Sequence, residues 1–258
     1  MAEREEGSEE SPPEVEIPEA VVETARRARR VVAVTGAGVS AESGVPTFRD
    51  AMTGLWARFR AEDLATPEAF ARDPATVWAW YVWRRRLLEG VRPNPAHEAL
   101  AEMSSLYPEF ALVTQNVDGL HQRAGSTDVI ELHGNLARDR CEVECGSWPG
   151  RTDEEGPPPC PACGRRLRPD VVWFGELLPS GALMTAFEAA EQCDLLLSIG
   201  TSGLVEPAAS IPRVAHASGA TVVVVNPEPS GPPGERMIHL RGPAGIVLPA
   251  LLTRIREG

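Results

Sequence analysis

Residues 31–49 read VVAVTGAGVSAESGVPTFR, and this stretch decides the fold. Residues 31–35 are an apolar, mostly β-branched run of the kind that forms a buried parallel strand. Residues 36–41, GAGVSA, fit the Gly-x-Gly-x-x-Gly/Ala pattern of a dinucleotide-binding turn. The glycines permit a tight turn and let the main chain approach a pyrophosphate, whose charge the N–H groups of the next helical turn would face. By itself this pattern also fits a plain turn after a strand.

The residues after the glycines make the stretch more specific. Residues 43–46, SGVP, end any helix early, because proline lacks an N–H and clashes with the preceding turn. Residues 47–49, TFR, then leave the sheet as a loop that can fold over a bound dinucleotide and bring an aromatic ring and a guanidinium to it. The whole string closely resembles the signature of the sirtuins, which are NAD-dependent protein-lysine deacylases.

The bulk composition limits the possible functions. The chain has 258 residues, enough for one large domain with an insertion or for two modest domains, and 43% of them are hydrophobic. The net charge of −12 argues against nucleic acid or an anionic membrane as the main partner. No apolar run is long enough to cross a membrane, and the acidic N-terminus is unlike a signal peptide. We therefore expect a cytoplasmic protein with its five cysteines reduced. We also expect it to be a monomer.

Strands alternate with helices along the chain, which predicts an α/β fold with a Rossmann-like, doubly wound parallel sheet. The expected strands are residues 31–35, 110–114, 129–132, 194–199, 221–225 and 237–240, and residues 168–174 are expected to return to the same sheet. Helices are expected at residues 19–30, from 67 onwards, and at 74–89, 95–106, 180–192 and 242–256.

Two segments interrupt this alternation and predict a second, small domain. Residues 51–93 hold most of the tryptophans and no strand pattern, so we expect a helical module that opens with a turn near residues 55–60. Residues 138–168 contain two pairs of cysteines, and we expect them to pack against the helical module as a zinc module. The remaining folded chain forms the NAD-binding domain, at residues 19–50, 94–137 and 169–258. Residues 1–18, rich in Glu, Ser and Pro, are expected to be a disordered tail.

Polar residues follow the second expected strand as Gln115-Asn116-Val117-Asp118-Gly119-Leu120-His121. Open α/β sheets place their ligand-binding groups at the carboxyl ends of strands. The same residues also suit a helix cap, where Asn and Asp are common. The stretch matches a sirtuin motif, and the resemblance implies that Gln115, Asn116 and Asp118 face the nicotinamide and its ribose.

His133-Gly134 ends the next expected strand. A lone histidine is usually structural, but an ordinary histidine pKa of about 6.5 allows it to take a proton near neutral pH. The pair matches the sirtuin motif that holds the catalytic histidine. The resemblance implies that His133 is the base toward the ribose hydroxyls, with Asn116 placing a water and Asp118 binding the carboxamide.

Four cysteines stand as Cys141-x3-Cys145 and Cys160-x2-Cys163. Four thiolates suit tetrahedral Zn²⁺ and leave no open coordination position, so such a site is structural. Two disulfides or free thiols are the alternative. Cys193 stands apart before an apolar strand, and we expect it to be a small buried hydrophobic residue.

The resemblance assigns further contacts to NAD beyond the glycine loop and the 115–118 motif. Small and hydroxyl residues at the end of the 194–199 strand suit phosphate or ribose contact, and they also suit a turn. Asn226 and Glu228 end the 221–225 strand, where they could meet the adenosine ribose. The implied cofactor-binding set is Gly36, Ala37, Gly38, Glu42, Phe48, Arg49, Gln115, Asn116, Asp118, Gly200, Thr201, Ser202, Asn226, Glu228 and Ala244.

Two segments resemble the sirtuin chains that flank an acyl-lysine peptide, which binds between them as an added β-strand. The first segment contributes Val172, Phe174, Gly175 and Glu176. The second contributes Gly203, Leu204 and Val205. The expected partner of this site is therefore a protein or peptide that contains an acylated lysine.

The helix expected at residues 74–89 predicts the kind of acyl group. Positions 77, 81, 84 and 88 form one stripe, and Val77 and Leu88 mark it as the buried face. Tyr81 and Arg84 share that face, where an arginine needs an anionic partner. Arg84 could instead reach water or a nearby Glu. Tyr81-x-x-Arg84, with the small Ala65, resembles the pocket of sirtuins that remove succinyl, malonyl and glutaryl groups.

The implied function is NAD-dependent removal of acyl groups from protein lysines, succinyl and malonyl before acetyl. The products would be free lysine, nicotinamide and O-acyl-ADP-ribose. A protein ADP-ribosyltransferase that uses the same site is one alternative. A non-enzymatic module that binds NAD and zinc is another, although it leaves His133 and Asp118 unexplained.

Overall fold

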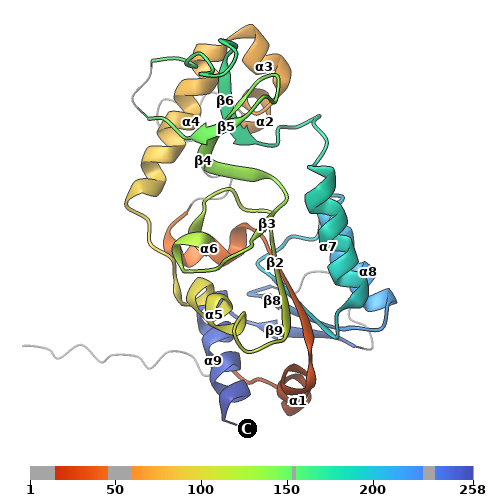
Figure 1. The fold of residues 1–258 in the computed structure, drawn as a ribbon. Coiled ribbons are helices and arrows are strands. Elements are labelled where there is room, and N and C mark those ends of the chain that lie inside the picture. Colours follow the sequence, from red (N-terminus) through yellow and green to blue (C-terminus); the bar gives the residue numbers. More distant parts are fainter. Residues whose placement is uncertain (1–14, 46–59, 153–154, 229–235, 258) are drawn as a thin grey trace, which may run out of the picture.

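The computed structural model describes residues 15–45, 60–152, 155–228 and 236–257. Its centre is a six-stranded sheet in the order β3-β2-β1-β7-β8-β9 (Figure 1). All neighbouring strands pair in parallel, which confirms the doubly wound α/β prediction. The strands are β1 (Arg30–Thr35), β2 (Glu109–Thr114), β3 (Ile130–Glu131), β7 (Leu195–Ile199), β8 (Thr221–Asn226) and β9 (Met237–Arg241).

The register of the sheet aligns the carboxyl ends of its central strands. Thr35, the last residue of β1, pairs with Thr114 of β2 on one side and with Ile199 of β7 on the other. The loops that begin at Gly36, Gln115 and Gly200 therefore start side by side at one edge. The strand order reverses at β1, and such a point is where an open α/β sheet binds its ligand.

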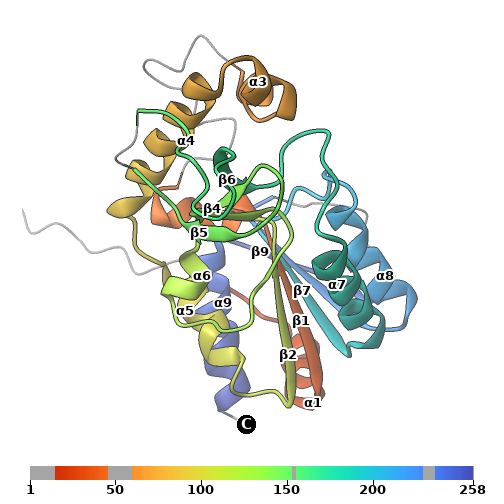
Figure 2. The ribbon, with the colours of Figure 1, turned by 45° about the horizontal axis from the view of Figure 1, so that its top comes forward.

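Helices cover both faces of this sheet, and β1 shows why. Its side chains alternate, because successive residues of a strand point to opposite faces. Val31 and Ala33 join the core under α1 (Glu19–Arg27), α5 (Pro95–Met103) and α9 (Ala244–Arg256). Val32 and Val34 join the core under α7 (Ser180–Gln192) and α8 (Ile211–Ala217). Figure 2 shows the two helical layers with the sheet between them.

The N-terminal part of the described chain differs from the expectation in two places. Ile17, which composition assigned to the tail, is 5% exposed and belongs to the main core. Helix α1 ends at Arg27, and Arg30 already pairs with Glu109 as the first residue of β1. Residues 1–14 lie outside the described part of the chain.

Local capping explains where α5 begins. The side chain of Asn94 accepts a hydrogen bond from the N–H of Ala96 at 2.9 Å, and Pro95 occupies the first helical position. The imidazole of His97 returns to the main chain of Asn94, which completes a capping box. His97 is fully buried, as expected of a structural histidine.

A second group of elements lies at the top of Figure 1, beyond the carboxyl edge of the sheet. Its helices are α2 (Ala61–Leu64), α3 (Pro67–Arg72) and α4 (Pro74–Glu89), and all three lie within the segment expected to be helical. The turn expected near residues 55–60 falls almost wholly within the part of the chain that is not described. Three antiparallel strands accompany the helices: β4 (Gly134–Cys141), β5 (Ser147–Pro149) and β6 (Leu167–Val171).

The expectation that residues 168–174 return to the main sheet is wrong. Strand β6 pairs with β4, with Cys141 opposite Leu167 and Gly134 opposite Val171. The four cysteines accompany this pairing, because Cys141 at the end of β4 lies beside Cys160 and Cys163 of the chain that leads into β6. The returning strand then runs back along β4.

Among the described residues no helix is long and apolar enough to span a membrane.

Candidate active site

The glycine loop is held by the loop after the neighbouring strand. Gly36 N–H donates to Ile199 O at 3.0 Å, and Gly38 N–H donates to Gly200 O at 3.0 Å. A Cβ on Gly38 would lie 2.7 Å from the Gly200 Cα, and a Cβ on Gly200 would lie 2.3 Å from the Val39 nitrogen. These glycines are therefore required by the contact between the two loops, in addition to any ligand.

The chain after the glycines forms η1 (Ala37–Ser43), a 3₁₀ helix that ends at Gly44 with a left-handed backbone. The early end of this helix agrees with the sequence. Ala37 and Gly38 are exposed, whereas Val39 and Ser40 are buried. The main chain thus faces outward at the position where the motif would meet a pyrophosphate. Phe48 and Arg49 lie outside the described residues.

Ser40, which the sequence analysis did not single out, joins three of the polar groups. Its hydroxyl donates to Oδ2 of Asp118 at 2.7 Å and accepts from Nδ2 of Asn116 at 3.1 Å. Nε2 of His97 lies 3.3 Å from the same oxygen. Asn116 also donates to Gly36 O at 3.1 Å. The glycine loop and the polar loop after β2 are therefore one hydrogen-bonded unit.

Asp118 has two roles at once. Its Oδ1 accepts the N–H of Leu120 at 2.9 Å, at the start of the short helix α6 (Leu120–Arg123). The N-cap residue itself is Gly119, which makes no side-chain cap, so Asp118 supports the start of the helix from the preceding position, while its Oδ2 faces Ser40. Behind this pair, His121 is buried against Thr35, and burial lowers the pKa of His121 to about 3. The imidazole of His121 is consequently neutral at physiological pH.

His133 follows β3 and is positioned through one ring nitrogen. Nδ1 lies 2.8 Å from the carbonyl oxygen of Gln115. A carbonyl only accepts, so Nδ1 must hold the proton and Nε2 must have the lone pair. Burial lowers the pKa of His133 below 6.5, so the imidazole is neutral at pH 7. The arrangement gives a neutral, oriented base beside Gln115.

The remaining residues expected at NAD surround the same edge. Asn226 Nδ2 donates to Thr201 O at 3.0 Å, which ties the end of β8 to the loop after β7. Glu42 Oε2 accepts the N–H of Gly245 at 2.6 Å, beside Ala244 at the start of α9. The structure thus brings most members of the predicted set to one side of the sheet. Ser202 and Glu228 are exposed there.

The first predicted substrate segment is a turn and not a strand. The N–H of Val172 donates to His133 O at 2.9 Å, and the N–H of Phe174 donates to Ala65 O at 2.9 Å. Residues 173–176 then turn, with Gly175 at φ 87°. Two main-chain donors are used inside the protein, and a lone segment has no second strand beside it. The segment still links His133 to Ala65.

Glu176 holds this turn in place. Its carboxylate accepts hydrogen bonds from both terminal nitrogens of Arg168, at 2.5 Å and 3.0 Å, and from the main-chain N–H of Trp173 at 2.8 Å. Arg140 approaches the same carboxylate at 3.3 Å. The predicted substrate residue Glu176 is thus engaged within the protein. Arg168 and Trp173 are functional candidates that the sequence analysis did not identify.

The second predicted substrate segment is also irregular in this structure. Residues 203–206 form bends and turns, and Leu204 is 82% exposed. An extended segment needs a neighbouring strand to satisfy its main-chain groups, and neither sheet of the described residues includes residues 203–206. The side chains of Leu204, Val205 and Phe174 leave apolar surface exposed.

Tyr81 and Ala65 meet in one apolar cluster, together with Trp173 and with Val117 at its margin. Tyr81 is 1% exposed, and its hydroxyl accepts the indole N–H of Trp173 at 2.9 Å. The predicted buried stripe of α4 is confirmed at Val77 and Tyr81, whereas Arg84 and Leu88 are half-buried. The sequence analysis missed that the other side of α4, which includes Trp78 and Arg85, is buried too.

Arg84 lies over two aromatic rings of its own helix. Its guanidinium carbon is 5.2 Å from the ring centroid of Trp80 and 5.6 Å from that of Tyr81. Burial lowers the pKa of Arg84, while the nearby Tyr81 and the charge of Asp118 act in the opposite direction. Arg84 is therefore within electrostatic reach of the polar loop after β2.

The four paired cysteines converge at the end of β4. Their sulfur atoms all lie within 4.8 Å of one another, and three of the non-bonded distances between sulfur atoms are 3.4 to 3.5 Å. A tetrahedral Zn²⁺ with bonds of about 2.3 Å places its sulfurs about 3.8 Å apart. The four thiols fit that geometry, and no disulfide joins them. Cys193 is separate and buried, and burial raises the pKa of its thiol to about 11.

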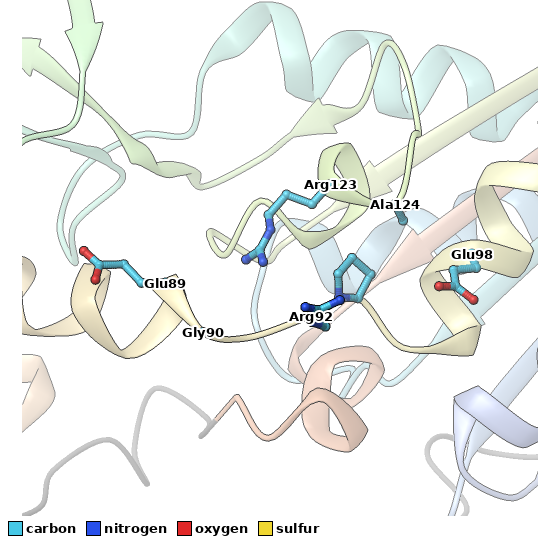
Figure 3. Close-up of a pocket in the computed structure, with 7 residues that line it drawn as sticks. Glu89, Gly90, Arg92, Glu98, Arg123 and Ala124 are labelled. Atoms are coloured by element: carbon cyan, nitrogen blue, oxygen red, sulfur yellow. The ribbon is translucent and has the colours of Figure 1, made fainter.

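A surface pocket of ≈ 520 Å³ lies away from these residues, where α4 leads into α5. Arg123 extends into it from α6 (Figure 3) and donates to the carbonyl oxygens of Leu88 and Val91. The lining residues are Glu89, Gly90, Arg92, Pro93, Glu98, Arg123 and Ala124. None of them belongs to the candidate active site.

Comparisons with known proteins agree on one family. The model of the Sir2 family matches residues 36–207. NAD-dependent protein deacylase 1 of Pseudomonas aeruginosa is 57% identical over 248 residues, covering 93% of this chain and 99% of the relative. NAD-dependent protein deacylase of Ralstonia nicotianae is 57% identical over 226 residues, covering 87% and 92%.

Solved structures give the same answer for the fold. A Sir2 homolog–NAD complex superposes with a TM-score of 0.86 at 43% identity, covering 94% of this chain and 95% of that one. A structure of Sir2 bound to acetylated peptide superposes with a TM-score of 0.79 at 28% identity, covering 91% and 97%.

Proposed function

This chain belongs to the Sir2 family, and we propose that the acyl groups it removes most efficiently end in a carboxylate, as succinyl and malonyl do. It is an NAD-dependent protein deacylase, as its relatives from Pseudomonas aeruginosa and Ralstonia nicotianae are named. These names favour deacylation over the ADP-ribosyltransferase and over the non-enzymatic module. The peptide in the Sir2 complex with acetylated peptide supports a protein or peptide as the substrate.

NAD would bind along the carboxyl edge of the sheet. The exposed main chain of Ala37 and Gly38 would meet the pyrophosphate, and Asn226 and Glu228 would meet the adenosine ribose. Bound NAD would supply the ribose that takes up the acyl group on a hydroxyl oxygen, with nicotinamide as the leaving group. The unit formed by Ser40, Asn116 and Asp118 would orient the nicotinamide end.

His133 would accept a proton from the ribose. Its Nδ1–H is held by Gln115 O, which leaves Nε2 as the acceptor. The lowered pKa keeps the acceptor unprotonated at neutral pH. The acyl-lysine peptide would lie between residues 172–176 and 203–205 as an added strand, because both segments present exposed apolar side chains there.

The four cysteines would hold one structural Zn²⁺. Cys141 ends β4, so the metal would fix the strand that begins directly after His133. No open coordination position would remain for a substrate.

The observation that supports the acyl preference is the position of Arg84. Three consecutive arginines of α4 have three different surroundings. Arg85 is buried against Asp139, and Arg86 is exposed and donates to Thr152 O at 2.7 Å. Arg84 alone of the three lies over Tyr81, whose cluster contains Ala65 and the turn after Val171. A guanidinium there could bind a carboxylate in a bidentate manner, and the phenol could donate a third hydrogen bond.

A panel of peptides tests this preference. Peptides that are identical except for acetyl-, malonyl-, succinyl- or glutaryl-lysine are incubated with NAD, and the products are measured by mass spectrometry. We expect a higher kcat/KM for succinyl- than for acetyl-lysine, with some deacetylation remaining. Arg84→Met should lower activity on succinyl-lysine far more than on acetyl-lysine, because only the first offers a charge to bind.

Arg86→Met is the matched control, since it removes the same charge from the exposed side of the same helix. It should leave the ratio of the two activities unchanged. A wild-type protein that prefers acetyl-lysine, or an Arg84→Met variant that loses both activities equally, would show that Arg84 does not read the acyl group.

A further inference from the structure

The hydrogen bond between Trp173 and Tyr81 fixes what the phenol can do. The indole N–H donates to the Tyr81 oxygen at 2.9 Å, and both side chains are buried. An indole N–H can only donate, whereas a phenol can accept and donate. With the indole on its oxygen, the phenol retains its O–H as a donor. Burial raises the pKa of Tyr81, so this proton stays in place at neutral pH.

Glu176, the carboxylate that acts electrostatically on Tyr81, already accepts hydrogen bonds from other groups of the protein. Its two oxygens accept the hydrogen bonds from Arg168, Arg140 and the main chain of Trp173 described above. A carboxylate with this many donors is a poor acceptor for a further O–H. The phenol proton is therefore better used on an acceptor that a substrate brings.

Trp173 is held rigidly enough to act as an orienting group. Its ring is 2% exposed and lies 5.2 Å from the ring of Phe70, centroid to centroid. The guanidinium carbon of Arg168 lies over the Trp173 ring, 3.3 Å from the ring centroid. Because Glu176 fixes both Arg168 and the main chain of Trp173, the indole cannot turn its N–H away without breaking several contacts.

We propose that Trp173 is a positioning residue for acyl selectivity, which commits the Tyr81 hydroxyl to donate toward a carboxylate held by Arg84. This inference rests on the proposed preference for such acyl groups. It adds that the selectivity depends on a residue of the peptide-binding turn, since Trp173 stands between Val172 and Phe174. The acyl pocket and the peptide site thus share one anchored residue.

Trp173→Phe tests the proposal, because phenylalanine keeps an aromatic ring and lacks the N–H. We expect kcat/KM for succinyl-lysine peptide to fall roughly three- to ten-fold more than kcat/KM for acetyl-lysine peptide, the range for one hydrogen bond, because only the succinyl group brings a carboxylate to the Tyr81 hydroxyl. In a Tyr81→Phe background, the same substitution should no longer change the ratio of the two values.

Trp78→Phe is the matched control. Trp78 is equally buried in α4, and its indole nitrogen has no hydrogen-bond partner among the described residues. It should lower both activities equally, or neither. Should Trp173→Phe fail to fold, 3-benzothienylalanine at position 173 keeps the indole shape and replaces the N–H by sulfur, and it should give the same selective loss.

Two results would overturn the inference. In the first, Trp173→Phe lowers both activities equally, as a packing defect would. In the second, its effect on the ratio persists without the Tyr81 hydroxyl. The proposed function is judged separately, by the wild-type preference and by Arg84→Met. A selective Arg84→Met with an unselective Trp173→Phe refutes only the role of Trp173, whereas a wild type without the preference refutes both.

Discussion

The guanidinium of Arg85 lies 2.5 Å from Oδ1 of Asp139, and the two side chains are only 5% and 0% exposed. Arg85 also donates to the carbonyl oxygens of Leu136, Arg138 and Arg151, at 2.7, 3.0 and 2.8 Å. Oδ2 of Asp139 accepts the N–H of Arg151 at 3.0 Å. This pair therefore joins α4 to β4 and to the chain after β5.

Asp139→Ala should destabilise the protein strongly, because it leaves the Arg85 charge buried without its partner. We expect the free energy of unfolding to fall by about 3–5 kcal/mol. Glu109→Ala, which breaks the exposed pair with Arg30, should cost less than about 1 kcal/mol. Urea unfolding of both variants measures this difference. Equal midpoints would mean that the buried pair is not what joins α4 to β4.

Gly200→Ala should weaken NAD binding. The new Cβ would lie 2.3 Å from the Val39 nitrogen, at a backbone φ of 60° that disfavours side chains. A strained residue of this kind costs about 1–3 kcal/mol, and relief requires the glycine loop to move. Titration with NAD should show the loss. Gly90→Ala, where nothing lies within 4 Å of the added carbon, should bind NAD as the wild type does.

His133→Ala should remove turnover and leave the fold and NAD binding largely intact. General-base assistance is worth about 10²–10⁴-fold. Because burial lowers the pKa of His133, the active neutral form persists below pH 6.5. The wild-type kcat/KM should therefore decline at a lower pH than it would with an ordinary histidine as the base. Near wild-type deacylation by the variant would refute the assignment, and His216→Ala on α8 serves as the control.

Metal analysis of protein purified without a chelator should find one zinc per chain. Cys160→Ser, or removal of the metal, should destabilise β4, β5 and β6 and lower activity indirectly, because none of the four sulfurs belongs to the glycine loop or the polar loop. Cys193→Ser should keep the metal, since that thiol is separate from the cluster. Full activity without metal would contradict a structural zinc.

The elements that could be predicted from the sequence are those with strong local patterns. The buried strands and the helix Pro74–Glu89 were predicted with the correct type because apolar period and proline position are local signals. The sheet to which β6 belongs could not be predicted in this way, because the sequence pattern of a strand does not show which other strand it pairs with. The cysteines that accompany that pairing were recognised only as ligands.

The candidate site shows the same division. Motif residues such as His133 and Asp118 could be named in advance, since their residue types stand at strand ends. Ser40 could not, because a small hydroxyl gives no signal until its three partners are placed around it. Arg85 stands in a run of three arginines, which does not indicate which of them is buried against Asp139, and Trp173 stands 92 residues away from Tyr81.

The stretch from His133 to Cys141 places three constraints on one strand, and together they limit its length. The base precedes Gly134, the partner of Arg85 is Asp139, and a metal ligand closes the same strand. A Cβ at Gly134 would lie 2.1 Å from the Asp170 oxygen, so the crossing with β6 is close as well. One inserted or deleted residue would turn every later side chain of the strand to the opposite face. We therefore expect this strand to tolerate substitutions between its fixed points but no insertion or deletion.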